Sequence, residues 1–430
     1  MIFEPELETM PRGELEALQL ERLQRLVAYL RDRVPLYRER LDEVQVRSLE
    51  DLRRLPFTRK SDLRDTYPFG LFAVPREQCV RLHASSGTTG RPIVVAYTRD
   101  DLDLFARVNA RVLAMAGAEP GMMLHNAYGY GLFTGGLGLH YGGERLGMTV
   151  VPVSGGMTER QLGLIQDLRP DVITCTPSYA LTLAQGFAER GVQPDEISLR
   201  FACVGAEPWT ENMRGEIDAG LGIRSTNIYG LSEIIGPGVS NECIEARDGS
   251  HVNEDNFLPE VVDAESGEPL PDGEQGVLVF TTLTKQALPL LRYWTGDITS
   301  LSREPCSCGR TLTRMALITG RTDDMLIVRG VNVYPTQVES VLLQVPELTP
   351  HYRLVVTRER TLDEVEVQVE VAESHFGRDS TELRPLEERV EKLIRETIGT
   401  SMRVTLLEPG QGPRSEGGKL ARVDDRRALA

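Results

Sequence analysis

Apolar and polar positions alternate with two different periods along the chain, and these periods predict its elements. Residues 14–43 carry apolar side chains every three or four positions, which predicts amphipathic helices. Between about 90 and 235, short apolar runs alternate with helical patterns, as where "DVITCTPS" precedes "YALTLAQGFAERG". Because neighbouring parallel strands need a crossover between them, this alternation predicts βαβ units and a doubly wound α/β sheet.

The pattern changes twice in the second half of the chain. Residues 255–315 hold short apolar runs such as "GVLVFTTL" and turn signals such as "PDGEQG", which together predict a β-rich subdomain. After "RTDDMLIVRGVNVYP", at 321–335, the predicted order is helix, strand, strand, helix and strand. We therefore expect a large N-terminal domain over 1–320 and a small α+β C-terminal domain over 321–430.

Composition and charge narrow the class of protein. The 430 residues carry a formal net charge of −16, which disfavours binding to nucleic acid or to an anionic membrane surface. No apolar run reaches the length of a membrane span, and the acidic N-terminal segment lacks the pattern of a secretory signal. We expect a cytoplasmic protein whose six scattered cysteines are reduced thiols rather than a disulfide framework.

The stretch "HASSGTTGRPIVVAYT", at 83–98, contains a loop of small residues between two apolar runs. Glycines let backbone N–H groups approach an anion, and hydroxyl groups add donors, so this loop is a candidate phosphate cradle. It lacks the Gly-Lys-Ser/Thr ending of a Walker A loop, and a polar surface turn is the alternative. The residues of the candidate cradle are Ser85, Ser86, Gly87, Thr88, Thr89 and Gly90.

Two further stretches carry residues that suit a nucleotide. In "NIYGLSE", Tyr229 is suited to stack on a base, Ser232 to donate to a phosphate and Glu233 to hold Mg²⁺. A strand end followed by a helix cap is the alternative for this stretch. In "LRYWTGDITSL", the carboxylate of Asp297 is suited to accept both ribose hydroxyls, and "ITGRTDDMLIVRGVNVYP" adds Arg321.

A lysine near the end of the chain is unusual for this composition. The chain has 44 arginines and only four lysines, and one of these, Lys419, lies in the glycine-containing stretch "GPRSEGGKLARV". A compact ammonium group on a flexible stem differs from a planar guanidinium in where it can reach. We therefore treat Lys419 as a candidate functional cation.

These five stretches, in this order, resemble the adenylate-forming superfamily of acyl-CoA synthetases, firefly luciferase and peptide-synthetase adenylation domains. The resemblance covers essentially the whole chain. Within that superfamily, "LPFTRKSDLRDTYPFGLFAVP", "NAYGYGLFTGGLGLHYGGERLG" and "LPLLRY" resemble phenylacetate–CoA ligases and their aryl-CoA ligase relatives. The implied reaction joins a small aromatic carboxylic acid to ATP, giving acyl-AMP and pyrophosphate, and then transfers the acyl group to coenzyme A. Loading of a phosphopantetheine carrier protein and a catalytically idle sensor are the alternatives.

The resemblance also implies a role for each motif. The loop 85–90 would hold the β- and γ-phosphates. The other implied nucleotide contacts are Ala206, Glu207, Tyr229, Gly230, Asp297 and Arg321. The implied catalytic residues are Ser232 at the α-phosphate, Glu233 at Mg²⁺, and Lys419 between the substrate carboxylate and the α-phosphate. The small domain would then swing about a hinge at Asp323 and bring Arg329 and Gly330 to coenzyme A. A homodimer is a further expectation from the resemblance.

Aromatic residues and glycines in "NAYGYGLFTGG" suggest where the acid binds, because glycines open space for a ring and aromatic side chains supply its walls. Packing in the core is the alternative for each aromatic residue. The candidate acid pocket consists of Tyr128, Tyr130, Phe133, Gly135, Gly136, Gly236 and Pro237.

Four metal-binding side chains lie in two short stretches. Cys243 and His251 are eight positions apart, and Cys306 and Cys308 flank one serine in "REPCSCGRTL". Three thiolates and one imidazole make a standard ligand set for tetrahedral zinc, so we predict a structural Zn²⁺ that ties two β segments together. Four unrelated reduced side chains are the alternative.

Overall fold

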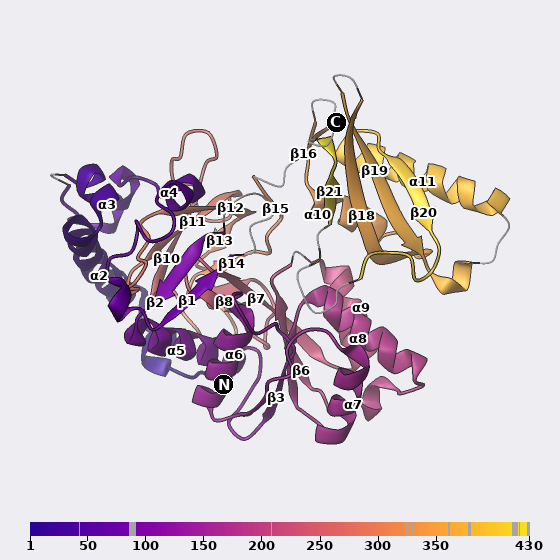
Figure 1. The fold of residues 1–430 in the computed structure, drawn as a ribbon, viewed down its shortest axis with the longest axis horizontal. Coiled ribbons are helices and arrows are strands. Elements are labelled where there is room, and N and C mark those ends of the chain that lie inside the picture. Colours follow the sequence, from indigo (N-terminus) through magenta and orange to yellow (C-terminus); the bar gives the residue numbers. More distant parts are fainter. Residues whose placement is uncertain are drawn as a thin grey trace.

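The computed structural model describes residues 1–427 except for 43, 86–91, 208, 323–325, 329–330, 360–361, 377–379, 415–419 and 421. The described residues form a large part with two extended sheets and a small part with a sheet of its own (Figure 1). This arrangement confirms the predicted mixed α/β class with a separate small C-terminal sheet. No helix in the described ranges has the length and apolar character needed to cross a membrane.

The first helices follow the predicted pattern, with one interruption. The periodic stretch 14–43 forms two helices, α2 (Arg12–Arg33) and α3 (Pro35–Arg40), which confirms the predicted amphipathic helices. Val34 is extended, because the ring of a following proline disfavours helical backbone in the preceding residue, and Pro35 then begins the next helix. The neighbouring short elements are α1 (Pro5–Glu8), η1 (Leu49–Arg54), α4 (Lys60–Asp65) and η2 (Arg76–Gln78).

A nine-stranded sheet with the order β13-β14-β9-β8-β7-β6-β5-β3-β4 forms the centre of the large part. Its parallel strands are β3 (Met123–Asn126), β4 (Thr149–Val151), β5 (Val172–Cys175), β6 (Phe201–Gly205) and β7 (Arg224–Leu231). Its antiparallel strands are β8 (Gly236–Glu242), β9 (Ser250–Val252), β13 (Leu301–Ser302) and β14 (Arg314–Met315). The parallel half confirms the predicted βαβ units.

Helices cover both faces of the parallel half. One layer consists of α5 (Arg99–Met115) and α6 (Gly135–Leu146), and the other of α7 (Thr158–Leu168), α8 (Pro177–Glu189) and α9 (Glu211–Leu221). Successive side chains of a strand point to opposite faces, so Ala202 and Val204 pack with α7–α9 while Cys203 packs with α5 and α6. Both faces are buried, so strands such as β5 and β6 are mainly apolar, whereas β7 begins with the polar residues Arg224–Asn227.

A second, four-stranded sheet follows in the large part, where the β-rich subdomain was predicted. It has the order β10-β11-β12-β15, with β10 (Phe257–Val262), β11 (Gly276–Thr282), β12 (Tyr293–Thr299) and β15 (Gly320–Arg321). The hairpin of β1 (Arg81–Ala84) and β2 (Val94–Tyr97) lies beside α5, and η3 (Pro194–Glu196) precedes β6. One apolar cluster joins α2, α5 and this second sheet through Leu26, Phe105 and Phe280.

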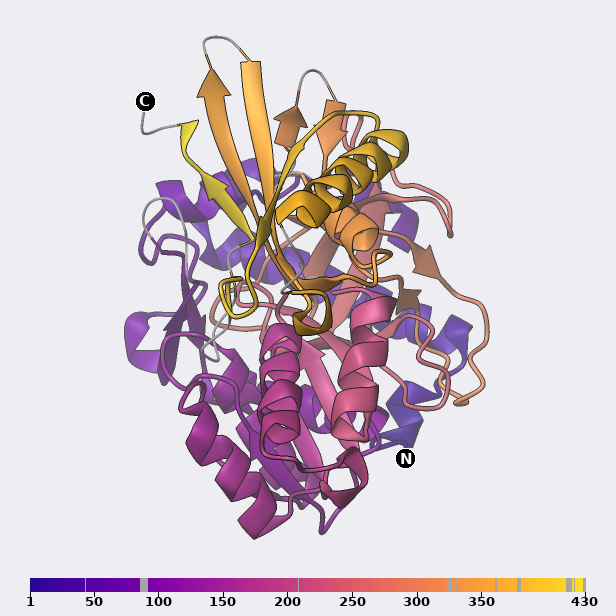
Figure 2. The same ribbon diagram turned by 90° about the vertical axis from the view of Figure 1, so that its right-hand side faces the viewer.

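The small part contains the five elements predicted for it. They are α10 (Pro335–Leu342), β18 (Leu348–Glu359), β19 (Leu362–Val371), α11 (Ser380–Ile398) and β20 (Arg403–Leu407). The added elements are β16 (Leu326–Val328), β17 (Val331–Val333), η4 (Glu373–His375) and β21 (Val423–Asp425). The sheet order is β20-β19-β18-β21, and in both views this sheet lies above α8 and α9 (Figures 1 and 2). The domain limits at 320 and 321 stay a prediction.

Candidate active site

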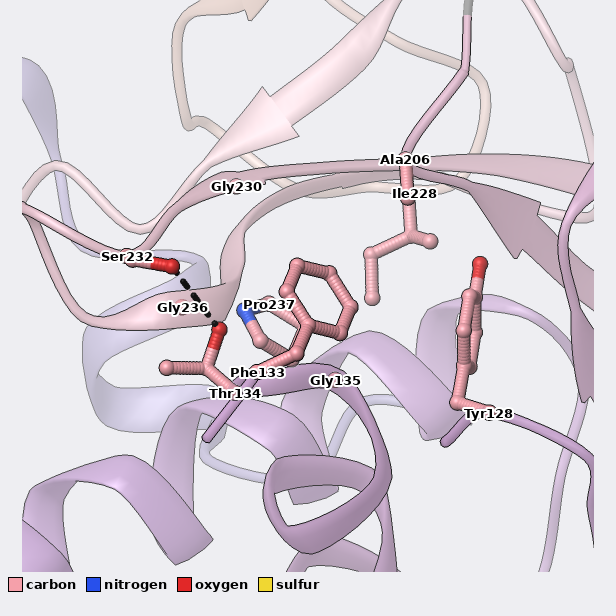
Figure 3. A pocket seen from close by; sticks show the side chains of 10 residues that line it. All are labelled: Tyr128, Phe133, Thr134, Gly135, Ala206, Ile228, Gly230, Ser232, Gly236 and Pro237. Atoms are coloured by element: carbon pink, nitrogen blue, oxygen red, sulfur yellow. Dashed lines mark hydrogen bonds between the residues drawn. The ribbon is translucent and has the colours of Figure 1, made fainter. Parts of the chain in front are cut away.

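Loops at the carboxyl ends of the parallel strands line a partly open cavity, in which the space between the atoms, open solvent included, is about 350 Å³. Ligands of open α/β sheets bind at these strand ends, near the point where the strand order reverses, which here lies between β3 and β5. Figure 3 shows the side chains of Tyr128, Phe133 and Ile228 directed toward the same space. The lining residues are Tyr128, Phe133, Thr134, Gly135, Ala206, Ile228, Gly230, Ser232, Gly236 and Pro237.

Glycines let the strands beside the cavity approach closely. A Cβ atom on Gly230 would lie 2.0 Å from the carbonyl oxygen of Gly236, and one on Gly205 would lie 2.1 Å from that of Ile228. Any other residue at either position would therefore force the backbones apart. Ala206, the next residue, has a φ of 69°, a left-handed conformation that is uncommon for a residue with a side chain. Strained backbone of this kind is often found at functional sites.

Five of the seven predicted acid-pocket residues line this cavity: Tyr128, Phe133, Gly135, Gly236 and Pro237. The other two lie elsewhere. The hydroxyl of Tyr130 accepts a hydrogen bond from Asn126 Nδ2 at 2.7 Å, and its oxygen lies 3.1 Å from His140 Nδ1. A Cβ atom on Gly136 would lie 2.6 Å from the carbonyl oxygen of Gly129. This glycine thus permits close packing of the loop on α6.

Two residues that line the cavity were not predicted from the sequence. Thr134 directly follows Phe133, and its hydroxyl lies 3.4 Å from that of Ser232 (Figure 3). Ile228 belongs to "NIYGLSE" and alternates with Tyr229 along β7. With a period of two, Ile228 faces the same side of the strand as position 230, and this is the signal that the sequence contains for Ile228.

The predicted nucleotide residues Tyr229, Asp297 and Arg321 lie together although they come from three strands. The hydroxyl of Tyr229 donates to Asp297 Oδ2 at 2.5 Å. Strand pairing places Arg321 directly opposite Asp297, and the guanidinium donates both to that carboxylate and, at 3.1 Å, to the carbonyl oxygen of Thr295. Burial and the neighbouring Asp297 carboxylate raise the pKa of Tyr229 well above its ordinary value, so the phenol stays protonated as a donor.

Ser232 and Glu233 lie in the turn that connects β7 to β8, so the helix-cap alternative is wrong. Glu233 is buried, and its Oε1 accepts a hydrogen bond from the hydroxyl of Tyr293 at 3.3 Å. The backbone of the turn is held by Lys285, whose Nζ donates to the carbonyl oxygen of Glu233 at 3.3 Å. Burial lowers the pKa of Lys285 to about 8. The turn is therefore fixed by side chains from the second sheet.

Several predicted residues lie outside the described ranges: Ser86, Gly87, Thr88, Thr89, Gly90, Asp323, Arg329, Gly330 and Lys419. Two described neighbours show where their loops begin or end. Ser85 pairs with Ile93 across the base of the small-residue loop, with its N–H 2.9 Å from the carbonyl oxygen of Ile93. Leu420, the residue after Lys419, donates its backbone N–H to Glu207 Oε1 at 2.7 Å.

The four predicted zinc ligands come together away from the cavity. Each residue offers one ligand atom, a sulfur from Cys243, Cys306 and Cys308 and a ring nitrogen from His251. These four atoms all lie within 4.8 Å of one another. The two sulfurs of Cys243 and Cys306 are 3.6 Å apart, and Cys308 Sγ is 3.4 Å from His251 Nε2. The other imidazole nitrogen faces the carbonyl oxygen of Leu312 at 3.4 Å. Hydrogen bonds from the Cys243 thiol and His251 lower the pKa of Cys308, which favours a thiolate there.

Family models match most of the chain. Residues 32–284 match the model described as AMP-binding enzyme, and residues 330–427 match that of the AMP-binding enzyme C-terminal domain. The chain belongs to the AMP-binding enzyme family. This result confirms the predicted adenylate-forming class, whose members use ATP to activate a carboxylic acid.

Several curated relatives within the family are phenylacetate-coenzyme A ligases. That of Thermus thermophilus is 66% identical over 99% of this chain and 100% of its own length. Those of Aromatoleum evansii and Escherichia coli are 51% and 49% identical over 98% of this chain and 96% and 97% of theirs. The predicted resemblance to these ligases is confirmed.

Solved structures of 2-hydroxyisobutyryl-CoA ligase are similar over the whole chain. In the postadenylation state with 2-HIB-AMP, that protein matches with a TM-score of 0.92 at 29% identity, over 100% of this chain and 93% of that one. In the thioesterification state with CoA the TM-score is 0.72 at 30% identity, over 99% and 92%. Since both structures are of one ligase, the arrangement of the two parts here is closer to that of the postadenylation state.

Proposed function

We propose that this protein is an ATP-dependent aryl- or arylacetate–CoA ligase of the phenylacetate–CoA ligase type. It joins the acid to ATP, giving acyl-AMP and pyrophosphate, and then joins the acyl group to coenzyme A, releasing AMP. The observation that carries this proposal is that the cavity and the nucleotide motifs have residues in common. Ala206, Gly230 and Ser232 line the cavity and also belong to the nucleotide motifs, so an acid in the cavity would present its carboxylate where the α-phosphate is expected.

The cavity suits an aromatic ring among its apolar walls. Tyr128 and Phe133 supply aromatic walls, Ile228 and Pro237 supply apolar ones, and Gly135 keeps the space open. Polar hydroxyls occur at one end, where Thr134 and Ser232 meet. An acid bound with its ring among the apolar walls would therefore direct its carboxylate toward Ser232. The roles of Tyr130 and Gly136 in acid binding have less support from this geometry.

The nucleotide would bind along the motif residues. Asp297 offers two carboxylate oxygens for the ribose hydroxyls, and Arg321 holds that carboxylate in place. Tyr229, Ala206 and the backbone of Glu207 would contact the adenine. The small-residue loop 85–90 would hold the β- and γ-phosphates.

Glu233 fits the role of Mg²⁺ ligand. Its carboxylate is buried and accepts a hydrogen bond from the neutral Tyr293 hydroxyl. Its carboxylate forms no ion pair with the described residues, because the nearby Lys285 ammonium donates to the backbone carbonyl oxygen of Glu233 instead. A bound Mg²⁺ would supply the charge that offsets the phosphates of ATP.

Lys419 would supply a second positive charge between the substrate carboxylate and the α-phosphate. The contact of its neighbour Leu420 with Glu207 supports a position beside the nucleotide motifs. For the second half-reaction, the domain 321–430 would swing about Asp323 and replace Lys419 by Arg329 and Gly330 next to the pantetheine arm of coenzyme A. The structural Zn²⁺ and a homodimer complete the proposed assembly.

A pyrophosphate-release panel tests this function. The purified protein is given ATP, Mg²⁺ and one acid at a time, namely phenylacetate, hydroxylated phenylacetates, benzoate or a fatty acid, with and without coenzyme A. We expect acid-dependent pyrophosphate release that is fastest with aryl acids, and thioester formation on coenzyme A. Acid-independent release would contradict a ligase. Acyl transfer to a phosphopantetheinyl carrier protein in preference to coenzyme A would favour the alternative acceptor.

A further inference from the structure

The side chain of Glu207 connects the large part to the segment that carries Lys419. Its Oε1 accepts a hydrogen bond from the backbone N–H of Leu420 at 2.7 Å. Its Oε2 accepts hydrogen bonds from the hydroxyl of Ser178 at 2.7 Å and from the backbone N–H of Ser178 at 3.3 Å. The two oxygens thus face opposite partners, one in each part of the molecule.

We infer that Glu207 is an interdomain latch, a positioning residue that holds the Lys419 segment at the nucleotide site during acyl-AMP formation and releases it for thioester formation. This inference rests on the proposed function. It assigns to the Glu207 carboxylate a role separate from the adenine contact expected of its backbone.

The large-part side of the latch is rigid. Ser178 lies in the first turn of α8, where unpaired backbone N–H groups favour a carboxylate, and Thr176 caps the same helix by accepting from Tyr179 N–H. Because the Ser178 hydroxyl and N–H both hold Oε2, the direction of Oε1 toward the small part is set before Leu420 arrives.

The small-part side is rigid as well. Arg422 donates to the carbonyl oxygens of Pro350 and Tyr352 at 3.2 Å, and its guanidinium lies over the Tyr352 ring at 4.6 Å. On the other side of the segment, Arg414 donates to both oxygens of Glu370 at 2.7 Å. Arg414 and Arg422 are therefore both bound to the small sheet, and the contact of Leu420 links this sheet to Glu207.

A carboxylate acceptor makes this contact stronger than a neutral one. Elsewhere the two parts meet, for example, through Asn212 Nδ2 and the carbonyl oxygen of Leu343, a bond between neutral groups at 3.4 Å. Since the present arrangement is closer to the postadenylation state than to the thioesterification state, the Glu207 contact belongs to the first arrangement. A swing of the small part would separate Leu420 from Glu207, so the latch should affect one half-reaction only.

The two half-reactions of the full chain test the latch. Glu207→Ala should slow acid-dependent pyrophosphate release by about 10–100-fold, the loss expected for a hydrogen bond to a charged group. Glu207→Gln keeps an oxygen acceptor and should slow it by roughly 3–10-fold. Thioester formation from supplied acyl-AMP and coenzyme A should change by less than about twofold in either variant. Glu211→Gln, the same change at an exposed glutamate of α9, is the matched control.

Equal losses in both half-reactions, together with a raised KM for acyl-AMP, would show that Glu207 only binds the adenylate and would overturn the latch. Unchanged pyrophosphate release would overturn it too. A second readout does not depend on the substrate. Hydrogen exchange in the peptide that contains Leu420 should be faster in Glu207→Ala than in the parent and unchanged in Glu211→Gln, and equal exchange in all three would refute the inference. Lack of ligase activity in the parent, by contrast, would count against the proposed function alone.

Discussion

The cysteine–histidine cluster leads to the sharpest stability prediction. With Zn–S bonds near 2.3 Å and Zn–N bonds near 2.0 Å, a tetrahedral site has ligand separations of about 3.8 Å between sulfurs and about 3.5 Å between sulfur and nitrogen. The structure has 3.6 Å for Cys243 and Cys306 and 3.4 Å for Cys308 and His251. These two separations lie within a few tenths of an ångström of the tetrahedral values, and the cluster as a whole, with separations of up to 4.8 Å, would contract by up to about 1 Å around the ion.

Zinc at this place would order more than its own ligands. Cys306 and Cys308 lie on the connection between β13 and β14. Arg310, two residues further along this connection, forms hydrogen bonds with the N-terminal segment of the chain. Arg310 donates to Glu8 Oε2 at 2.6 Å and to the carbonyl oxygen of Met1 at 2.7 Å. Loss of the metal should loosen this connection and the N-terminal segment together.

We expect Cys306→Ser to lose zinc and to unfold at a lower temperature. A metal present at 1,000 times its dissociation constant stabilises the folded state by about 4 kcal/mol. At roughly 2 °C per kcal/mol, the low end of the range because the large part is long, Tm should fall by about 8 °C. Activity at 25 °C should stay within about twofold of the parent, because no residue of the cluster lines the cavity.

The assay combines metal analysis by mass spectrometry with thermal unfolding. Cys79→Ser is the matched control, because Cys79 is a half-buried thiol outside the cluster. It should leave both the zinc content and Tm unchanged. A parent protein that contains no zinc after growth in zinc-supplemented medium would refute the reasoning, as would a Cys306→Ser protein with the parent's zinc content and Tm.

Three further predictions concern the ligase reaction. Gly135→Ala would place a Cβ atom 2.7 Å from Phe133 Cε1 and so narrow the cavity. We expect kcat/KM for the largest accepted acid to fall by about 10–200-fold and kcat/KM for small acids to fall much less. An equal loss across the acid panel would contradict the cavity assignment. Asp297→Asn removes the charged acceptor that Tyr229 and the ribose would share, and kcat/KM for ATP should fall by about 10–100-fold, measured at saturating acid; an unchanged value would exclude Asp297 from the nucleotide site. Lys419→Ala should slow pyrophosphate release by roughly 10²–10³-fold and spare thioester formation from acyl-AMP, and equal rates for parent and variant would exclude its charge from adenylation.

Local patterns in the sequence were sufficient for most elements. The alternation of apolar runs and helical stretches predicted β5, α8, β6 and α9 because each depends on side chains that are neighbours along the chain. The same argument predicted α10, β18, β19, α11 and β20 in order. The boundary between α2 and α3 at Pro35 also has a local cause.

Contacts between distant residues needed the fold. Tyr229 and Asp297 are 68 positions apart and meet only because the two sheets bring β7 and β12 together. The sequence analysis placed Tyr128 and Tyr130 together in the acid pocket. In the structure Tyr128 lines the cavity, whereas the hydroxyl of Tyr130 faces Asn126 and His140. Composition could not distinguish them, because direction depends on the backbone of the loop.

The sequence by itself determined the order of most elements, the four side chains of a candidate metal site and the family to which the motifs belong. Only the tertiary structure decided which motif residues share a cavity, and that the Glu207 carboxylate faces Leu420 across the two parts. The physical reason is that periodicity and motif spacing reflect interactions along the chain. Strand order, register and the packing of the small sheet determine which side chains meet across long separations in sequence.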